Sequence, residues 1–358
     1  MHVHAKIKIR LQNIEKYKRR FHAMNVGLIG CGWAANVHLQ AYQRIKDVKV
    51  VAVSDINFHK AKTFADRYKI PKIFSNYIDL LESKNLNLDL VDICTPTSTH
   101  AEIACNVAKY GYDILLEKPM ARTSALCDQI ISEVSKRNVR LCVCHNRLFN
   151  PAVKEAKSSG DYKLVKTVYR THVTSHWSQK PEEGGMLWEN GTHCAYIQNY
   201  FLGNVEEVWA VGDKIGNPTY YKIFSLLKSK DEVVGVMELS WVSDHYEDML
   251  ELYKFDRSVK IDLSYFPKRF FDIYNYDYSV SQILKEAVKA LYNRATFMLS
   301  ASTPRTFHFE LIKKYIDSLK SNEEPPVKPT EGRAAIRLLE CIEKSIETGK
   351  WVRFNASQ

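Results

Sequence analysis

Apolar positions follow two alternating spacings between Met24 and about residue 147. Five continuous apolar runs have the length of buried strands: "NVGLIGC", "VKVVAVSD", "LVDICTP", "YDILLEKP" and "VRLCVCHN". The segments between them repeat apolar residues at helical spacing, as in "AANVHLQAYQRI" and "TSALCDQIISEVSKRN". Continuous apolar strands separated by helices predict a parallel sheet covered on both faces, which is a doubly wound α/β domain over residues 24–147.

The first strand leads into a glycine-containing turn, "GCGWAANVH". Gly30 permits a tight turn, and Gly32 lets the backbone approach a pyrophosphate. Trp33 and Ala34 then open a helix whose N-terminus attracts a phosphate group. Ala35 stands where a dinucleotide-binding turn has its third glycine, and it is small enough for close packing of helix on sheet. The turn therefore predicts a Rossmann-type cofactor site rather than an ordinary strand-to-helix turn.

A carboxylate closes the second strand, since Asp55 follows Gly32 by 23 residues. An acid at this place binds the hydroxyls of the adenosine ribose and repels a 2′-phosphate. NAD is therefore the expected cofactor. Lys60 and Lys62 lie nearby and keep NADP open as a second candidate.

The formal net charge is +10, but the first 23 residues hold seven Lys or Arg and one Glu. Without this leader the chain has 44 basic and 40 acidic residues, so the body carries no strong signature of nucleic-acid binding. Three interpretations of residues 1–23 stay open: a basic arm for an anionic partner, a targeting peptide and an upstream extension. We favour the extension, because the leader lacks both a Ser-rich composition and an apolar segment.

No apolar run reaches the ~18 residues that a membrane span needs, so no membrane association is expected. The eight cysteines are scattered and form no CxxC pair, which is typical of buried thiols in a reducing compartment. A cytoplasmic location is therefore expected. The sequence has no zinc-binding, P-loop or serine-elbow pattern, so it implies no metal.

Four stretches carry a family resemblance: "GLIGCGWAANVH", "DICTPTSTHAEIA", "LLEKPMARTSA" and "GGMLWENGTHCAYIQNYFLG". A fifth, "FHFELIKKYIDSLKSNEEPPVKPTEGRAAIRLLECIEKSI", looks like the closing helices of the same family. With them the chain resembles the Gfo/Idh/MocA oxidoreductases from residue 24 to about residue 352. The resemblance implies NAD or NADP as cofactor and a hydroxyl of a sugar, cyclitol or sugar derivative as the reacting group. It also implies an α+β second domain, residues 148–358, with a large, mostly antiparallel sheet whose open face forms a homodimer or homotetramer.

The tripeptide Glu117-Lys118-Pro119 follows a predicted strand, at the edge of the sheet where ligands of such folds bind. The resemblance assigns Lys118 to the substrate hydroxyl and Glu117 to a supporting role near the cofactor. An ammonium group there donates to the alcohol oxygen and stabilises the developing alkoxide. The alternative interpretation is a lysine at a strand end in water.

A second cluster lies in "MLWENGTHCAYIQNYFL". If this stretch is one helix, Glu189 and His193 stand one turn apart on the same face, with Tyr196 three residues further on. A carboxylate beside an imidazole fixes its tautomer and raises its basicity. His193 is therefore the expected general base and Glu189 its orienting group, whereas family members usually carry Asp in the position of Glu189. The alternative for His193 is a structural histidine in the core.

Several weaker candidates complete the expected site. The strand end at Thr95, Pro96 and Thr97 is expected to pass over the cofactor, with His100 near the start of the next helix. That helix is expected to begin at Thr99 in a capping box with Glu102. Residues expected near the substrate are Arg147, Asn150, His176 and Tyr196, where Arg147 binds either an anionic substrate group or a structural carboxylate. An apolar stripe over residues 279–300 predicts a helix in the core or at a subunit interface.

These observations favour an NAD(P)-dependent dehydrogenase acting on the CH–OH group of a sugar, cyclitol or nucleotide sugar. Two alternatives stay open. One is a non-catalytic NAD(P)-binding regulator built on the same scaffold, which would need neither Lys118 nor His193. The other is a reductase of a substrate that is not a sugar.

Overall fold

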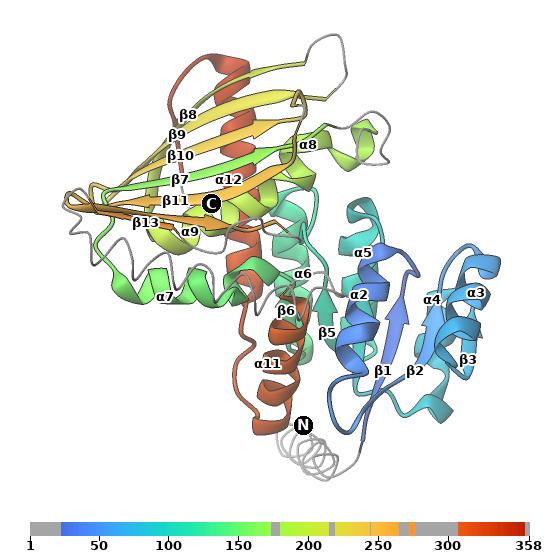
Figure 1. Ribbon diagram of the computed structural model, residues 1–358. Coiled ribbons are helices and arrows are strands. Elements are labelled where there is room, and N and C mark those ends of the chain that lie inside the picture. Colours follow the sequence, from blue (N-terminus) through green and yellow to red (C-terminus); the bar gives the residue numbers. More distant parts are fainter. Residues whose placement is uncertain are drawn as a thin grey trace, which may run out of the picture.

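The structure is a computed structural model that describes residues 23–172, 180–214, 219–243, 245–264, 272–275 and 307–354. The predictions for residues 1–22, for His176 and for the helix at 279–300 lie outside the described residues. Two sheets stand side by side in Figure 1, one in the blue-to-green first part of the chain and one in the green-to-orange second part.

The first sheet is parallel and has six strands in the order β3-β2-β1-β4-β5-β6. The strands are β1 Met24–Ile29, β2 Val48–Ser54, β3 Lys72–Phe74, β4 Leu90–Ile93, β5 Asp113–Leu116 and β6 Leu141–Val143. The helices between them are α2 Trp33–Tyr42, α3 Phe58–Tyr68, α4 Tyr77–Glu82, α5 Thr97–Lys109 and α6 Ser124–Arg137, with the short turn η2 Lys84–Leu86. This arrangement confirms the predicted doubly wound domain.

The apolar runs became central strands because both faces of the sheet are covered. Every residue of β4 and of β5 is buried, although successive side chains point to opposite faces. Strands β1 and β4 are neighbours in the middle of the sheet. After β1 the chain continues to β2 on one side of this pair, and after β4 it continues to β5 on the other side. The loops that follow β1 and β4 therefore diverge, and such a divergence opens a crevice at the carboxyl ends of the strands.

The start of α5 differs from the prediction. The helix begins at Thr97 with Pro96 as its N-cap, so the capping box of Thr99 with Glu102 is wrong. The Thr99 hydroxyl instead lies 2.8 Å from Thr95 Oγ1 and 2.8 Å from the Pro96 carbonyl oxygen. Pro96 fixes the backbone at the entry to the helix, so the helix starts before Thr99.

The second sheet has eight strands in the order β13-β12-β11-β7-β10-β9-β8-β14. They are β7 Leu164–Arg170, β8 Val205–Asp213, β9 Lys222–Ser229, β10 Val234–Ser240, β11 Glu247–Tyr253, β12 Arg257–Asp262, β13 Asp272–Asn275 and β14 Val352–Arg353. Among the described strands of this second sheet, only the β7–β10 pair is parallel, which confirms the mostly antiparallel sheet. Burial alternates residue by residue along β9, so one face of the sheet is packed and the other is open.

The remaining elements lie between and around the sheets. They are η3 Asn146–Phe149, α7 Pro151–Ser159, η5 Pro181–Glu183, α8 Gly185–Glu189, α9 Gly191–Leu202, α11 His308–Ser321 and α12 Pro329–Thr348. Helices α9 and α12 pack on the second sheet, and α12 also contacts α6 of the first domain (Figure 1). None of the described helices is long and apolar enough to cross a membrane.

The C-terminal helices α11 and α12 also contact the first domain. Helix α11 contacts α2 and η3, and the start of α12 approaches β6 closely at Gly332. A Cβ atom on Gly332 would lie 2.8 Å from the Met120 sulfur and 2.8 Å from Val143 Cγ2. Residues far apart in the chain therefore meet at the carboxyl edge of the parallel sheet. The domain boundary predicted between residues 147 and 148 stays a prediction.

Candidate active site

Lys118 stands at the carboxyl edge of the parallel sheet, two residues after the end of β5. Its side chain is mostly buried, and its Nζ atom lies 3.0 Å from Glu189 Oε1 and 3.2 Å from the Glu189 carbonyl oxygen. These contacts join the cofactor domain to the end of α8. The ammonium group is thus held by a carboxylate from a distant segment rather than lying free in water.

The loop around Lys118 is supported by His100. The ring lies with Nδ1 2.8 Å from the Pro119 carbonyl oxygen and Nε2 2.9 Å from the Thr95 carbonyl oxygen. Burial lowers the pKa of His100, although the two carbonyl groups favour its charged form. A neutral ring donates to one of these oxygens. His100 therefore braces two strand ends against each other from a buried position.

The expected contact of Glu189 with His193 is wrong. The helix is interrupted at Asn190, so Glu189 ends α8 while His193 lies in the first turn of α9. The Asn190 side chain accepts a hydrogen bond of 2.7 Å from Trp241 Nε1, which fixes the chain at the interruption. Glu189 faces Lys118 as a result, and it is not the group that orients His193.

Tyr196 orients His193 instead. Its hydroxyl lies 2.8 Å from His193 Nδ1, 3.3 Å from Asn146 Oδ1 and 3.3 Å from the backbone nitrogen of Arg147. The backbone N–H can only donate, and the amide oxygen can only accept. If the phenol proton goes to Asn146, the phenol oxygen accepts from both other groups. His193 then carries its proton on Nδ1, and Nε2 is left as an acceptor.

His193 is a buried, neutral imidazole in this arrangement. Burial lowers its pKa well below the ordinary value, and the positive charges of Arg147 and Lys118 lower it further. A neutral imidazole with one free ring nitrogen is able to take up a proton. These features fit the predicted general base.

Two residues predicted to bind substrate have structural partners. Arg147 forms a buried ion pair with Asp248, with Nη1–Oδ1 at 3.0 Å and Nη2–Oδ2 at 2.5 Å. Burial raises the pKa of Asp248 to about 6, against the opposing effect of the Arg147 charge. Asn150 caps α7 by accepting a 2.9 Å hydrogen bond from the Ala152 backbone. Of the two roles considered for Arg147, the structure shows the contact with a structural carboxylate.

The glycine turn has the shape that a dinucleotide needs. Gly30 has a φ of +91°, and a Cβ atom there would lie 2.5 Å from the Cys94 carbonyl oxygen. A Cβ on Gly32 would meet no atom within 4 Å, so the start of α2 borders open space. No side chain caps this helix at Gly32, and Ala35 is fully buried against the sheet. The turn therefore leaves room for a phosphate group beside a helix N-terminus.

The neighbouring predicted cofactor residues lie around this space. Asp55 accepts hydrogen bonds of 2.9 Å from the backbone nitrogens of Cys31 and Asn57, which ties the second strand to the glycine turn. Trp33 is 56 % exposed, whereas Ala34 is half-buried. The strand-end loop is exposed at Pro96, half-buried at Thr95 and buried at Thr97. These positions fit NAD, with Asp55 placed for a ribose and the glycine turn for a pyrophosphate.

Two family models match the chain in order along its length. Residues 24–145 match the model described as "Oxidoreductase family, NAD-binding Rossmann fold", and residues 153–258 match the "GFO/IDH/MocA C-terminal domain". The chain belongs to the Gfo/Idh/MocA oxidoreductase family. Its first domain is an NAD-binding Rossmann domain, and the recognition made from the sequence is confirmed.

Curated relatives span nearly the whole chain. An uncharacterized oxidoreductase of Bacillus subtilis is 25 % identical over 90 % of this chain and 94 % of its own length. The myo-inositol 2-dehydrogenase of Thermotoga maritima is 24 % identical over 92 % and 98 %, respectively. Among solved structures, the WlbA dehydrogenase of Bordetella pertussis, in complex with NADH and UDP-GlcNAcA, has a TM-score of 0.80 at 19 % identity, over 94 % of this chain and 99 % of that one.

This member of the Gfo/Idh/MocA family carries a buried polar network that sequence analysis missed. His38, in α2, has Nδ1 2.9 Å from Asp92 Oδ2 and Nε2 2.9 Å from Glu117 Oε1. His308 has Nε2 3.5 Å from the same Glu117 oxygen. The available signal was the histidine in "GCGWAANVH", which lies on the buried face of the helix.

The charges of Glu117 and His38 depend on the groups that they contact in this network. Burial opposes ionisation of Glu117, but hydrogen bonds from His308 and His38 hold its pKa well below the ordinary range. Burial likewise opposes protonation of His38, but the neighbouring Asp92 charge raises its pKa well above the ordinary value. Glu117 is therefore an ionised carboxylate directly before Lys118 in the chain. Its placement fits the predicted supporting role.

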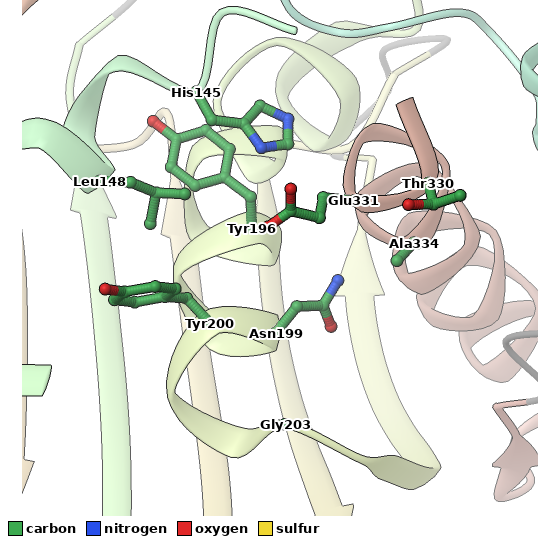
Figure 2. Close-up of a pocket in the computed structure, with 9 residues that line it drawn as sticks. All are labelled: His145, Leu148, Tyr196, Asn199, Tyr200, Gly203, Thr330, Glu331 and Ala334. Carbon is green, nitrogen blue, oxygen red and sulfur yellow. The ribbon is translucent and has the colours of Figure 1, made fainter. Parts of the chain in front are cut away.

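A cavity of about 230 Å³ lies behind Tyr196, between α9, η3 and the start of α12 (Figure 2). The Tyr196 ring stacks on His145 in its wall, with ring centroids 4.2 Å apart. The lining residues are His145, Leu148, Tyr196, Asn199, Tyr200, Gly203, Thr330, Glu331 and Ala334. Lys118 and His193 are not among them. The cavity is therefore distinct from the positions of Lys118 and His193.

Proposed function

We propose that the protein is an NAD-dependent dehydrogenase that acts on a CH–OH group of a sugar, cyclitol or nucleotide sugar. The observation that carries this proposal is an ammonium, Lys118, held by Glu189 at the carboxyl edge of an NAD-binding domain. A buried imidazole, His193, supports it, since Tyr196 orients its ring and the Lys118 charge helps to lower its pKa. The relative described as a myo-inositol 2-dehydrogenase supports the substrate class.

The cofactor residues divide the binding of NAD among them. The glycine turn from Gly30 to Ala35 and the start of α2 receive the pyrophosphate, and Asp55 receives the adenosine ribose. NAD is favoured over NADP because the Asp55 carboxylate would repel a 2′-phosphate, although Lys60 Nζ lies 3.5 Å from it. When bound, NAD supplies the acceptor for a hydride.

The chain's own residues handle the proton and the developing charge. Lys118 donates a hydrogen bond to the substrate oxygen and stabilises negative charge on it. Nε2 of His193 accepts the hydroxyl proton, while Tyr196 holds the opposite nitrogen. Glu189 keeps the Lys118 side chain in place and close to the substrate oxygen.

We also propose a homodimer or homotetramer formed through the open face of the second sheet. Large apolar side chains gather on this face, each more than a third exposed: Val211, Phe224, Leu226 and Val234. Val211 and Phe224 are direct neighbours across β8 and β9. Contiguous exposed apolar side chains on a sheet face are typical of subunit contacts.

The free thiols of the eight cysteines support a cytoplasmic location.

The decisive experiment follows NADH absorbance while the protein is mixed with NAD and a panel of sugars, cyclitols and nucleotide sugars. We expect turnover with at least one member of the panel. Lys118→Ala should abolish turnover while leaving NAD affinity nearly unchanged. NAD binding without turnover on any such substrate would instead support the regulator, and turnover of only a non-sugar carbonyl compound would support the other alternative.

A further inference from the structure

Four side chains with metal-binding atoms lie close together at the carboxyl edge of the parallel sheet. His38 Nε2, Glu117 Oε1, Cys144 Sγ and His308 Nε2 all lie within 4.8 Å of one another. All four residues are buried. They come from α2, the residue after β5, the residue after β6 and the first turn of α11, so no short sequence motif contains them.

Two of the known distances among these atoms fit a tetrahedral site directly. The His38 nitrogen is 2.9 Å from the Glu117 oxygen and 3.6 Å from the Cys144 sulfur, and the His308 nitrogen is 3.5 Å from the Glu117 oxygen. Ligand atoms about 2.0–2.3 Å from a tetrahedral zinc ion stand about 3.3–3.8 Å from one another. The distances of 3.5 and 3.6 Å lie in this range, whereas the 2.9 Å hydrogen bond between His38 and Glu117 would lengthen when the ion takes the place of its proton. Two imidazoles, one thiolate and one carboxylate are also ligand types that zinc prefers.

The surroundings of His38 strengthen this interpretation. Its other nitrogen, Nδ1, lies 2.9 Å from Asp92 Oδ2, and the Tyr42 hydroxyl donates to the same carboxylate at 3.0 Å. Metal-binding histidines usually donate their second N–H to a carboxylate, which fixes the tautomer. Asp92 would thus orient His38 with Nε2 toward the ion.

The charges of the pocket favour a cation. The carboxylates of Asp92 and Glu117 are both buried, and no Lys or Arg side chain bonds to either of them among the described residues. Buried carboxylates need a compensating charge. A divalent cation bound beside these carboxylates would offset their charge.

We propose that His38, Glu117, Cys144 and His308 bind one zinc-class divalent cation. Binding releases the proton on His38 Nε2 and the Cys144 thiol proton, while Nε2 of His308 coordinates in its neutral form. All four positions are filled by protein groups, so the ion has a structural rather than a catalytic role. It fastens α11 to the cofactor domain directly beside Lys118.

The test measures metal in untagged protein purified without chelators. We expect about one zinc-class ion per chain by mass spectrometry of the metal, and a lower melting temperature after the ion is removed with a chelator. Cobalt(II) added to the metal-free chain should give tetrahedral visible bands and a thiolate charge-transfer band. These readouts need neither NAD nor substrate, so they are independent of the proposed dehydrogenase activity.

Variants assign the ligands. Cys144→Ala should abolish the thiolate band and lower zinc affinity at least about tenfold, and His308→Gln should lower the affinity similarly. Cys142→Ala is the matched control, because Cys142 is also buried in β6 but is not among the four ligands. If Cys144→Ala does not fold, His308→Gln and the wild-type cobalt spectrum still decide. A wild-type chain that neither contains nor takes up zinc or cobalt would overturn the proposal, as would unchanged metal binding in both ligand variants.

Discussion

The Nζ atom of Lys118 lies 3.0 Å from Oε1 of Glu189, and this contact joins the carboxyl edge of the parallel sheet to the end of α8. The two residues are 71 positions apart in the chain. The carboxylate therefore holds the ammonium group at the place where the cofactor domain meets the second domain. This relationship replaces the one expected from the sequence, in which Glu189 served His193.

Removing the Glu189 carboxylate should impair turnover more than binding. We expect Glu189→Ala to lower kcat about tenfold to a hundredfold, because Lys118 loses the group that positions it against the substrate oxygen. Glu189→Gln retains a hydrogen-bond acceptor and should lose less. Steady-state kinetics measure both variants, with NAD affinity as the control. Equal kcat in wild type and Glu189→Ala would contradict the positioning role.

The two glycines of the turn should respond differently to alanine. Gly30→Ala places a Cβ against the Cys94 carbonyl at positive φ, so we expect the free energy of unfolding to fall on the order of 3 kcal/mol. Gly32→Ala meets open space and should change stability by less than about 0.5 kcal/mol. It should nevertheless weaken NAD binding about tenfold or more, because the new methyl group occupies the space expected for the pyrophosphate.

Denaturant unfolding and NAD titration separate the two effects. The matched pair differs only in the position of one methyl group within a three-residue turn. Tight NAD binding by a stable Gly32→Ala chain would mean that the cofactor does not lie against this turn.

The lowered pKa of His193 makes a prediction about pH. Because the folded chain disfavours the charged ring, this residue contributes stability above its unfolded pKa of about 6.5 that is lost as the pH falls below that value. The slope for one such group is about 1.4 kcal/mol per pH unit. Urea unfolding at several pH values should show a shallower acid-side slope for His193→Asn than for wild type.

An exposed histidine provides the control for this measurement. His59 is exposed on α3, so His59→Gln is measured in parallel as a histidine substitution outside the buried site. The same slope in wild type and His193→Asn would show that His193 titrates alike in the folded and unfolded chain.

The open face of the second sheet makes a prediction about assembly. We expect the wild-type chain to sediment as a dimer or tetramer and Phe224→Asp to sediment as a smaller species, because a buried, unpaired carboxylate opposes association. Phe255→Asp is the control, since Phe255 is 88 % exposed and lies outside the sheet strands. A monomeric wild-type chain at micromolar concentration would rule out this interface.

Local pattern was sufficient for much of the fold and for part of the site. The apolar runs predicted the parallel strands because those strands are buried on both faces, and burial acts on each residue in place. The glycine turn was likewise predictable, since Gly30 meets a requirement of its own backbone conformation. The N-cap of α5 was misplaced by three residues, at Thr99 instead of Pro96, because both residues offer a start signal.

The sequence by itself determined the parallel sheet, the glycine turn with Asp55, and Lys118 and His193 as candidates, because each depends on residues close together in the chain. The second sheet was expected only from the family resemblance. Only the tertiary structure decided the partners. The interruption at Asn190 turned Glu189 toward Lys118, and Tyr196 took its place beside His193. Helix α11 packs against α2, and this packing brings together the buried side chains of His38, Glu117, Cys144 and His308. No local spacing in the sequence encodes a contact between segments so far apart.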